Sequence, residues 1–157
     1  MQNLDSTFKS IHSVRGTVAF ILSKTPLDQL NKIPEGQSNN IIWNAAHIIS
    51  VQQLLVNRRS GAPYTEPKEL TSNYKPGTAP DADMDQDFVS MLQERLIVNA
   101  QEMESGYIKG LFKDYEPFTT RTKSVLESDA DAINFELFHS GLHLGYIMSY
   151  LNLLKKI

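Results

Sequence analysis

The segment from about Ser128 to Lys156 restricts the fold of this chain more than any other feature. It contains no proline, it has Asp129 and Asp131 in its first turn, and it ends with two lysines. Acidic residues at the start and basic residues at the end both suit the dipole of a helix. Apolar residues cover nearly every side of this helix, which is typical of an interior position. The segment therefore predicts a central helix in a helical assembly.

Three other segments also have the pattern of long helices. Apolar residues recur at intervals of three, four or seven from about Ser6 to Lys24, and they surround most of a helix from Ser38 or Asn39 to about Ser60. Carboxylates predict a third helix start at residues 81–85, and this helix is expected to end by Gly106. Four such helices in 157 residues predict an all-α four-helix bundle in a single domain, residues 1–157.

The segments between these helices are expected to be connections. Residues 61–82 contain four prolines and two glycines, so they are predicted to form a long connection without a helix. A connection of this length is usually functional or crosses over along the bundle. Residues 27–38 and 107–126 are also predicted as connections, and residues 119–125 fit either an extended segment or a short helical turn.

Composition excludes several classes of function. The chain has no cysteine, which excludes disulfides, thiolate metal sites and a cysteine nucleophile. Its 15 basic and 18 acidic residues give a formal charge of −3, which does not favour docking to nucleic acid or to an anionic membrane. The strongest apolar run near the N-terminus, Val18 to Leu22, is too short for a signal peptide or a membrane span. We expect a cytoplasmic protein with a small-molecule or protein partner.

Two of the four histidines, His139 and His143, lie one turn apart in the middle of the C-terminal helix. This spacing places both imidazoles on one face, from which they can reach a single metal ion. Burial of two imidazoles is costly unless a metal or hydrogen bonds satisfy them. The spacing alone leaves both interpretations open.

His47 occupies the middle of the second predicted helix, which is apolar on most sides. Side chains near it on the helical wheel include hydrogen-bonding groups that are suited to fixing an imidazole tautomer. These neighbours are Trp43, Asn44, Ser50 and Val51. Taken alone, His47 fits a core histidine with satisfied hydrogen bonds, and His12 in the first helix is expected to have no function.

Glu136 and Tyr146 share the face of the histidine pair and are the candidate catalytic residues. Glu136 lies one turn before His139, so it is a candidate hydrogen-bond partner of a ligand, a fourth ligand or a general base, or a salt-bridged helix residue. Either residue could shuttle a proton. A metalloprotease motif is excluded, because it requires a glutamate directly after the first histidine, where this chain has Ser140.

Gly141 and Gly145 are also one turn apart, on the side of the last helix away from the histidines. Small residues at this spacing let another backbone approach closely. They predict contact with a neighbouring helix or with a second subunit.

The sequences IIWNAAHII around His47 and FHSGLHLGYIMSYL around the histidine pair resemble the DinB-like superfamily, also called DinB/YfiT-like. The resemblance covers essentially the whole chain, and its specific part is these two helices. It implies a four-helix bundle in the order up-down-down-up, with residues 61–82 as the long connection between helices two and three. One difference is that many members follow the last histidine with Arg-Gly-Gln, whereas this chain has Leu144, Gly145 and Tyr146.

The resemblance also implies a divalent metal site, commonly for nickel or zinc, formed by His47, His139 and His143, and frequent homodimers. Characterised relatives include transferases and isomerases that use low-molecular-weight thiols, in which the metal activates the thiol. A metal-dependent enzyme is therefore predicted, with S-transferase-type or hydrolase chemistry on a small molecule. The alternatives are a non-enzymatic stress-response bundle that binds a metal or small ligand, and histidines that only share buried hydrogen bonds.

Overall fold

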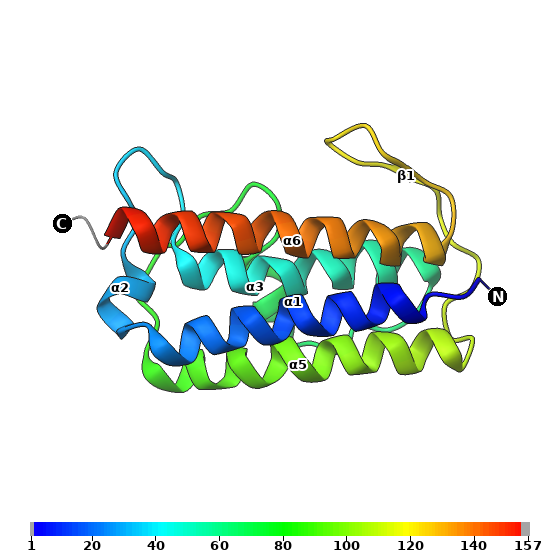
Figure 1. The fold of residues 1–157 in the computed structure, drawn as a ribbon. Helices are drawn as coiled ribbons and strands as arrows, with labels where there is room; N and C mark the ends of the chain where they lie inside the picture. Colours follow the sequence, from blue (N-terminus) through cyan, green and yellow to red (C-terminus); the bar gives the residue numbers. More distant parts are fainter. Residues whose placement is uncertain (1, 155–157) are drawn as a thin grey trace.

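The computed structural model describes residues 2–154, and four long helical segments dominate them (Figure 1). These segments are α1 (Asp5–Lys24), a segment that begins with α3 (Ile41–Gln52), α5 (Gln86–Ile108) and α6 (Asp129–Leu154). α1 and α3 each pack against both α5 and α6. The predicted all-α class is confirmed, and the only strands in the described residues form a hairpin of two-residue strands.

The predicted starts of two helices are confirmed to within a few residues, because each has a capping side chain. The side chain of Asn40 accepts a hydrogen bond from the backbone N–H of Trp43 at the start of α3. The carboxylate of Asp85 accepts from the N–H of Phe88 at the start of α5. Both caps satisfy a backbone donor that the first helical turn leaves free.

The end of α5 differs from its prediction. The helix continues past Gly106 to Ile108 and ends at a turn in which Gly110 has a positive φ of 64°. Leu111 N–H donates to the carbonyl of Gly106, and Gly110 N–H donates to that of Tyr107, which is the hydrogen-bond pattern of a glycine-terminated helix. Gly106 serves packing instead, since a Cβ there would lie 2.9 Å from the ring of Phe112.

The second helical segment ends where the sequence predicts, but it is not regular. After α3 the chain forms a π-helical turn, η1 (Gln53–Asn57), and a 3₁₀ turn, η2 (Arg58–Ser60). Gly61 follows in the left-handed conformation, with φ at 67°. The segment thus changes its hydrogen-bonding pattern about two turns beyond His47.

Residues 27–38 and 61–82 were both predicted as connections, and the prediction that residues 61–82 contain no helix was wrong. Two short helices occur there, α2 (Leu27–Asn31) and α4 (Lys68–Asn73). Each begins directly after a proline, Pro26 or Pro67. A proline at this position does not break the helix, because the first turn does not use its missing N–H.

Residues 107–126 contain a hairpin in which β1 (Phe118–Thr119) pairs antiparallel with β2 (Val125–Leu126). The extended alternative for residues 119–125 is therefore confirmed at the two strands. In Figure 1 this hairpin projects beside the N-terminal half of α6. The predicted helix end at Lys155 and Lys156 lies outside the described residues.

The core consists of two apolar halves with a polar layer between them. One half contains Val18, Leu92 and Ile147, and the other contains Phe8, Met103 and Ile133. Buried polar side chains lie between the two halves along all four helical segments. They include Arg15, Gln52, Asn99, Glu136 and Ser140, together with the three predicted metal ligands.

The surface of α6 is open over its two glycines. A Cβ added at Gly141 or Gly145 would meet nothing within 4 Å, so no helix among the described residues approaches these glycines closely, and the other alternative, contact with a second subunit, stays a prediction. None of the helices within residues 2–154 has the length and apolarity that crossing a membrane requires.

Candidate metal centre

Three histidines from two helices meet in the polar layer of the core. His47 comes from α3, and His139 and His143 come from α6, which packs against it. Each offers a ring nitrogen, and these three atoms all lie within 4.8 Å of one another. Each residue is at most 8 % exposed. Nitrogens bound to one zinc ion lie at most about 4 Å apart, so the cluster is close to the size of a metal site.

Hydrogen bonds define the tautomers of two of these histidines. His143 Nδ1 lies 2.8 Å from Oδ1 of Asn44, and His47 Nδ1 bonds to the backbone carbonyl of Tyr74. A carbonyl oxygen only accepts, so each Nδ1 carries the proton and donates it. Each Nε2 is then left with a free lone pair, which is the form that binds a metal.

The third histidine shows an incomplete version of the same arrangement. His139 Nδ1 lies 3.8 Å from Oε2 of Glu136, and neither atom has a hydrogen-bond partner among the described residues. Closing this distance to about 2.8 Å would give His139 an oxygen acceptor like those of the other two. An unsatisfied imidazole beside two oriented ones fits a site that a divalent ion completes, and a three-imidazole donor set suits zinc or nickel.

Glu136 belongs to a buried network behind the histidines. Its Oε1 accepts a hydrogen bond from Nη2 of Arg15 at 2.7 Å and one from the hydroxyl of Ser140 at 2.8 Å. Arg15 also donates to Oε1 of Gln52 at 2.9 Å. Both charged side chains are fully buried. The network joins α1, α3 and α6 directly under the ligand cluster.

Arg15 was not among the residues predicted from the sequence, although the sequence contains a signal for it. The buried residues of α1 are Phe8, Ile11, Arg15, Val18 and Leu22, which recur at helical intervals. A charged residue in the middle of an apolar stripe must have a buried partner, because an unpaired charge is costly to bury. The interruption of the stripe would have pointed to Arg15 as a residue with a buried partner. That partner, Glu136, lies on another helix, α6.

The electrostatics of the site favour neutral imidazoles. Burial, with a smaller contribution from the neighbouring histidines, lowers the pKa of His139 to about 2 and that of His143 to about 3. Burial also lowers the pKa of His47, although its bond to Tyr74 opposes the change. Burial raises the pKa of Glu136, which Arg15 opposes. Neutral histidines are the form that metal coordination requires.

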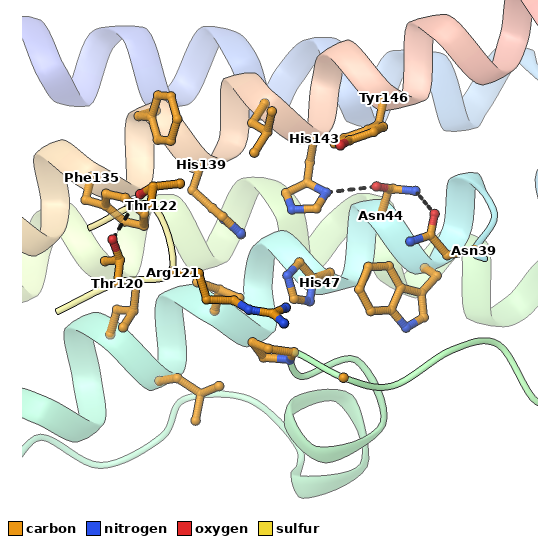
Figure 2. Close-up of a pocket in the computed structure, with 18 of the residues that line it drawn as sticks. Asn39, Asn44, His47, Thr120, Arg121, Thr122, Phe135, His139, His143 and Tyr146 are labelled. Atoms are coloured by element: carbon orange, nitrogen blue, oxygen red, sulfur yellow. Dashed lines mark hydrogen bonds between the residues drawn. The ribbon is translucent and has the colours of Figure 1, made fainter. Parts of the chain in front are cut away.

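The histidines line a cavity of about 710 Å³ between α3, α6 and the hairpin (Figure 2). Trp43 stacks on His47, with ring centroids 4.4 Å apart. Tyr146 lines the same cavity with its ring 6.0 Å from that of His143, and it is 45 % exposed. Glu136 does not line the cavity. The structure therefore brings four of the five predicted site residues to the cavity wall and places Glu136 behind it.

The chain matches the model of a known protein family. A family model described as the DinB superfamily matches residues 10–147. The matched range includes all three histidines and both candidate catalytic residues. No curated protein and no solved structure matches the chain.

Proposed function

This chain belongs to the DinB superfamily, and from this premise we propose that it is a metal-dependent enzyme acting on a small molecule. The proposed ligands of its divalent ion, nickel or zinc, are His47, His139 and His143. The observation that carries the proposal is the convergence of three buried imidazoles in the wall of a cavity. The directions of the long helices in Figure 1, α1 and α6 one way and α3 and α5 the other, support an up-down-down-up bundle.

When bound by three neutral imidazoles, such an ion supplies a Lewis acid with an open position, which lowers the pKa of a water or a thiol. The chain's own groups would prepare this site. Asn44 and the carbonyl of Tyr74 orient two imidazoles through their Nδ1 protons. We propose that Glu136 orients the third, since its carboxylate is fully buried beside His139. Of the roles predicted for Glu136, this is that of a hydrogen-bond partner of a metal ligand.

Tyr146 is the proposed proton shuttle, because it lines the cavity next to His143. The proposed reaction is transfer of a low-molecular-weight thiol to an electrophilic small molecule, or hydrolysis. In the transfer, the sulfur loses its proton and forms a bond to carbon, while the leaving group departs with the electron pair. Tyr146 would relay the proton to that group. A cytoplasmic location remains a prediction of the sequence.

We also propose a homodimer that forms through the outer face of α6. Phe138, Gly141, Gly145 and Met148 form one stripe along this helix, and both large side chains are 53 % exposed. Phe138 also lines the edge of the cavity, so this stripe adjoins it. The open space over both glycines supports close contact with the same face of a second copy.

Metal analysis of His143→Ala tests the proposed centre. We expect about one divalent ion per wild-type chain after dialysis, and loss of that ion in the variant with helix content unchanged by circular dichroism. His12→Ala is the matched control, because His12 bonds to Glu104 outside the cavity. Unchanged metal content in His143→Ala would contradict the centre.

A thiol-transfer assay with common cellular thiols then tests the chemistry. The expected result is turnover by wild type that His143→Ala loses. A wild-type protein that binds metal without turnover would favour the alternative, a non-enzymatic bundle that binds metal or a small ligand. The apolar part of the cavity wall is compatible with that alternative.

A further inference from the structure

Basic side chains gather in the wall of the cavity that contains the histidines. Three arginines line it, Arg58, Arg59 and Arg121, and Glu116 is the only acidic residue among its lining residues in the described chain. The chain as a whole carries a formal charge of −3. The cavity is therefore locally positive in a protein that is acidic overall, an arrangement that concentrates anions.

One of the three arginines has a structural role. Arg59 forms an ion pair with Glu116 at 3.3 Å and donates to the backbone carbonyl of the same residue. Its guanidinium also lies 4.1 Å from the ring centroid of Phe118. These contacts fasten the start of the hairpin to η2, so Arg59 is occupied.

The other two arginines are available. Within residues 2–154, the side chains of Arg58 and Arg121 have no hydrogen bond or ion pair, and both residues are exposed. Arg121 lies on the turn between β1 and β2, and Figure 2 shows its guanidinium extending into the cavity toward His47 and His139. Arg58 begins η2, about three turns beyond His47 on the same helical segment.

The two ends of the cavity differ in character. On the side of the histidines that faces η2 and the hairpin, the wall also includes apolar side chains, those of Val51, Leu54, Leu55, Phe135 and Phe138. Beyond His143 the lining is polar but uncharged, with Gln37, Asn39 and Tyr150. A molecule with one anionic end would therefore bind in a single orientation, with that end away from Tyr150.

We propose that Arg58 and Arg121 form a subsite for an oxyanion, a carboxylate or a phosphate, on the substrate of this centre. An apolar portion of the same substrate would contact the apolar side chains of this wall. Planar guanidinium groups match both oxyanions through charge-assisted hydrogen bonds. The inference rests on the proposed function, because it names the class of molecule on which the metal centre acts.

Binding to metal-free protein tests the subsite separately from the metal chemistry, since a carboxylate could otherwise bind the ion itself. The probes are 4-phenylbutyrate, its neutral amide 4-phenylbutyramide, and phenyl phosphate, titrated into ¹⁵N-labelled protein. We expect an anionic probe to bind about tenfold more tightly than the amide and to shift the side-chain Nε–H resonances of both arginines. The tighter of the two anions identifies the oxyanion.

The double variant Arg58→Gln/Arg121→Gln should lose this preference, so that acid and amide bind equally. Lys123→Gln is the matched control, because Lys123 is an exposed cation on the same hairpin that does not line the cavity. It should keep the preference. Equal wild-type binding of all three probes, no binding at millimolar concentration, or a preference that survives in the double variant would each overturn the subsite. A failed metal analysis would instead overturn the proposed function and leave this titration interpretable.

Discussion

Each imidazole of the candidate centre depends on a different oxygen atom. His143 uses the side chain of Asn44, His47 uses a backbone carbonyl, and His139 faces the buried carboxylate of Glu136. Such partners fix the ring orientation and raise the basicity of a ligand. Of the three oxygens, that of Asn44 is the one that a substitution can remove without breaking the ion pair under the site.

Replacement of Asn44 by leucine should therefore weaken metal binding. We expect the Kd for zinc to rise ten- to a hundredfold, since His143 loses the acceptor of its Nδ1 proton. Competition with a chelating dye measures this change. Ser50→Ala is the control, because Ser50 is buried on the same helix and bonds to the carbonyl of Thr71 outside the cavity lining. Equal zinc affinity in Asn44→Leu would refute the orienting role.

The lowered histidine pKa values predict an acid-sensitive metal-free protein. An unfolded histidine has a pKa near 6.5, whereas folding lowers the pKa of His139 to about 2 and that of His143 to about 3. Below about pH 6.5 the unfolded chain thus binds protons that the folded chain does not. The free energy of unfolding should fall as pH decreases, by up to about 1.4 kcal/mol per pH unit for each histidine.

Urea denaturation of metal-free protein between pH 7 and pH 5 measures this dependence. The double variant His139→Gln/His143→Gln should show a flatter pH dependence, because all other titrating groups are common to both proteins. Identical slopes for the variant and wild type would show that these two histidines do not titrate between the folded and unfolded states as inferred.

At the scale of single residues, the sequence predicted those features of the candidate centre that follow from the geometry of one helix. The pairing of His139 and His143 follows from their spacing, and the position of His47 opposite them was implied by family resemblance. The acceptor for His47 was not predictable, because the carbonyl of Tyr74 lies in a connection whose path depends on tertiary contacts. The predicted neighbour Asn44 instead bonds to a histidine on the other helix.

The ion pair of Arg15 and Glu136 connects α1 to α6, and its removal should affect the stability of the whole fold. Arg15→Met leaves a fully buried carboxylate without its cation. We expect the free energy of unfolding to fall by about 3–5 kcal/mol, measured by urea denaturation. The double variant Arg15→Met/Glu136→Leu should lose less, since no unpaired charge remains. A loss below about 1 kcal/mol in the single variant would contradict this account.

At the scale of elements, end signals were reliable where a side chain or a left-handed glycine provides them. Asn40, Asp85 and Gly61 mark helix ends close to the predicted positions. Gly106 misled the prediction because it accommodates the ring of Phe112 inside a continuing helix. The π-helical turn η1 leaves no signal in apolar periodicity, since nearly all of its residues are buried.

The whole molecule combines two apolar core halves with a polar layer that contains the candidate centre. Apolar periodicity predicts both halves but not their separation, because the polar residues of the layer come from four distant segments. Three residues of this layer, His47, His139 and His143, line the cavity beside α6. The proposed dimer contact on the outer face of α6 adjoins the cavity at Phe138, and a substitution elsewhere on that face can separate the two roles.

Gly141→Gln should convert the dimer into a monomer without harming the fold. A glutamine side chain fills the open space over α6 that a second copy would occupy, while glutamine has a better helix propensity than glycine by about 0.5–1 kcal/mol. Sedimentation should show a monomer. The substitution itself should not lower the melting temperature of that monomer.

Gly16→Gln is the control, because Gly16 also lies within a helix, α1, with nothing within 4 Å of its Cβ position. It should remain a dimer. A dimeric Gly141→Gln protein would move the interface away from this face, and a monomeric wild type would refute the dimer itself. Zinc affinity should be unchanged in both variants, because Gly141 does not line the cavity and every proposed ligand comes from one chain.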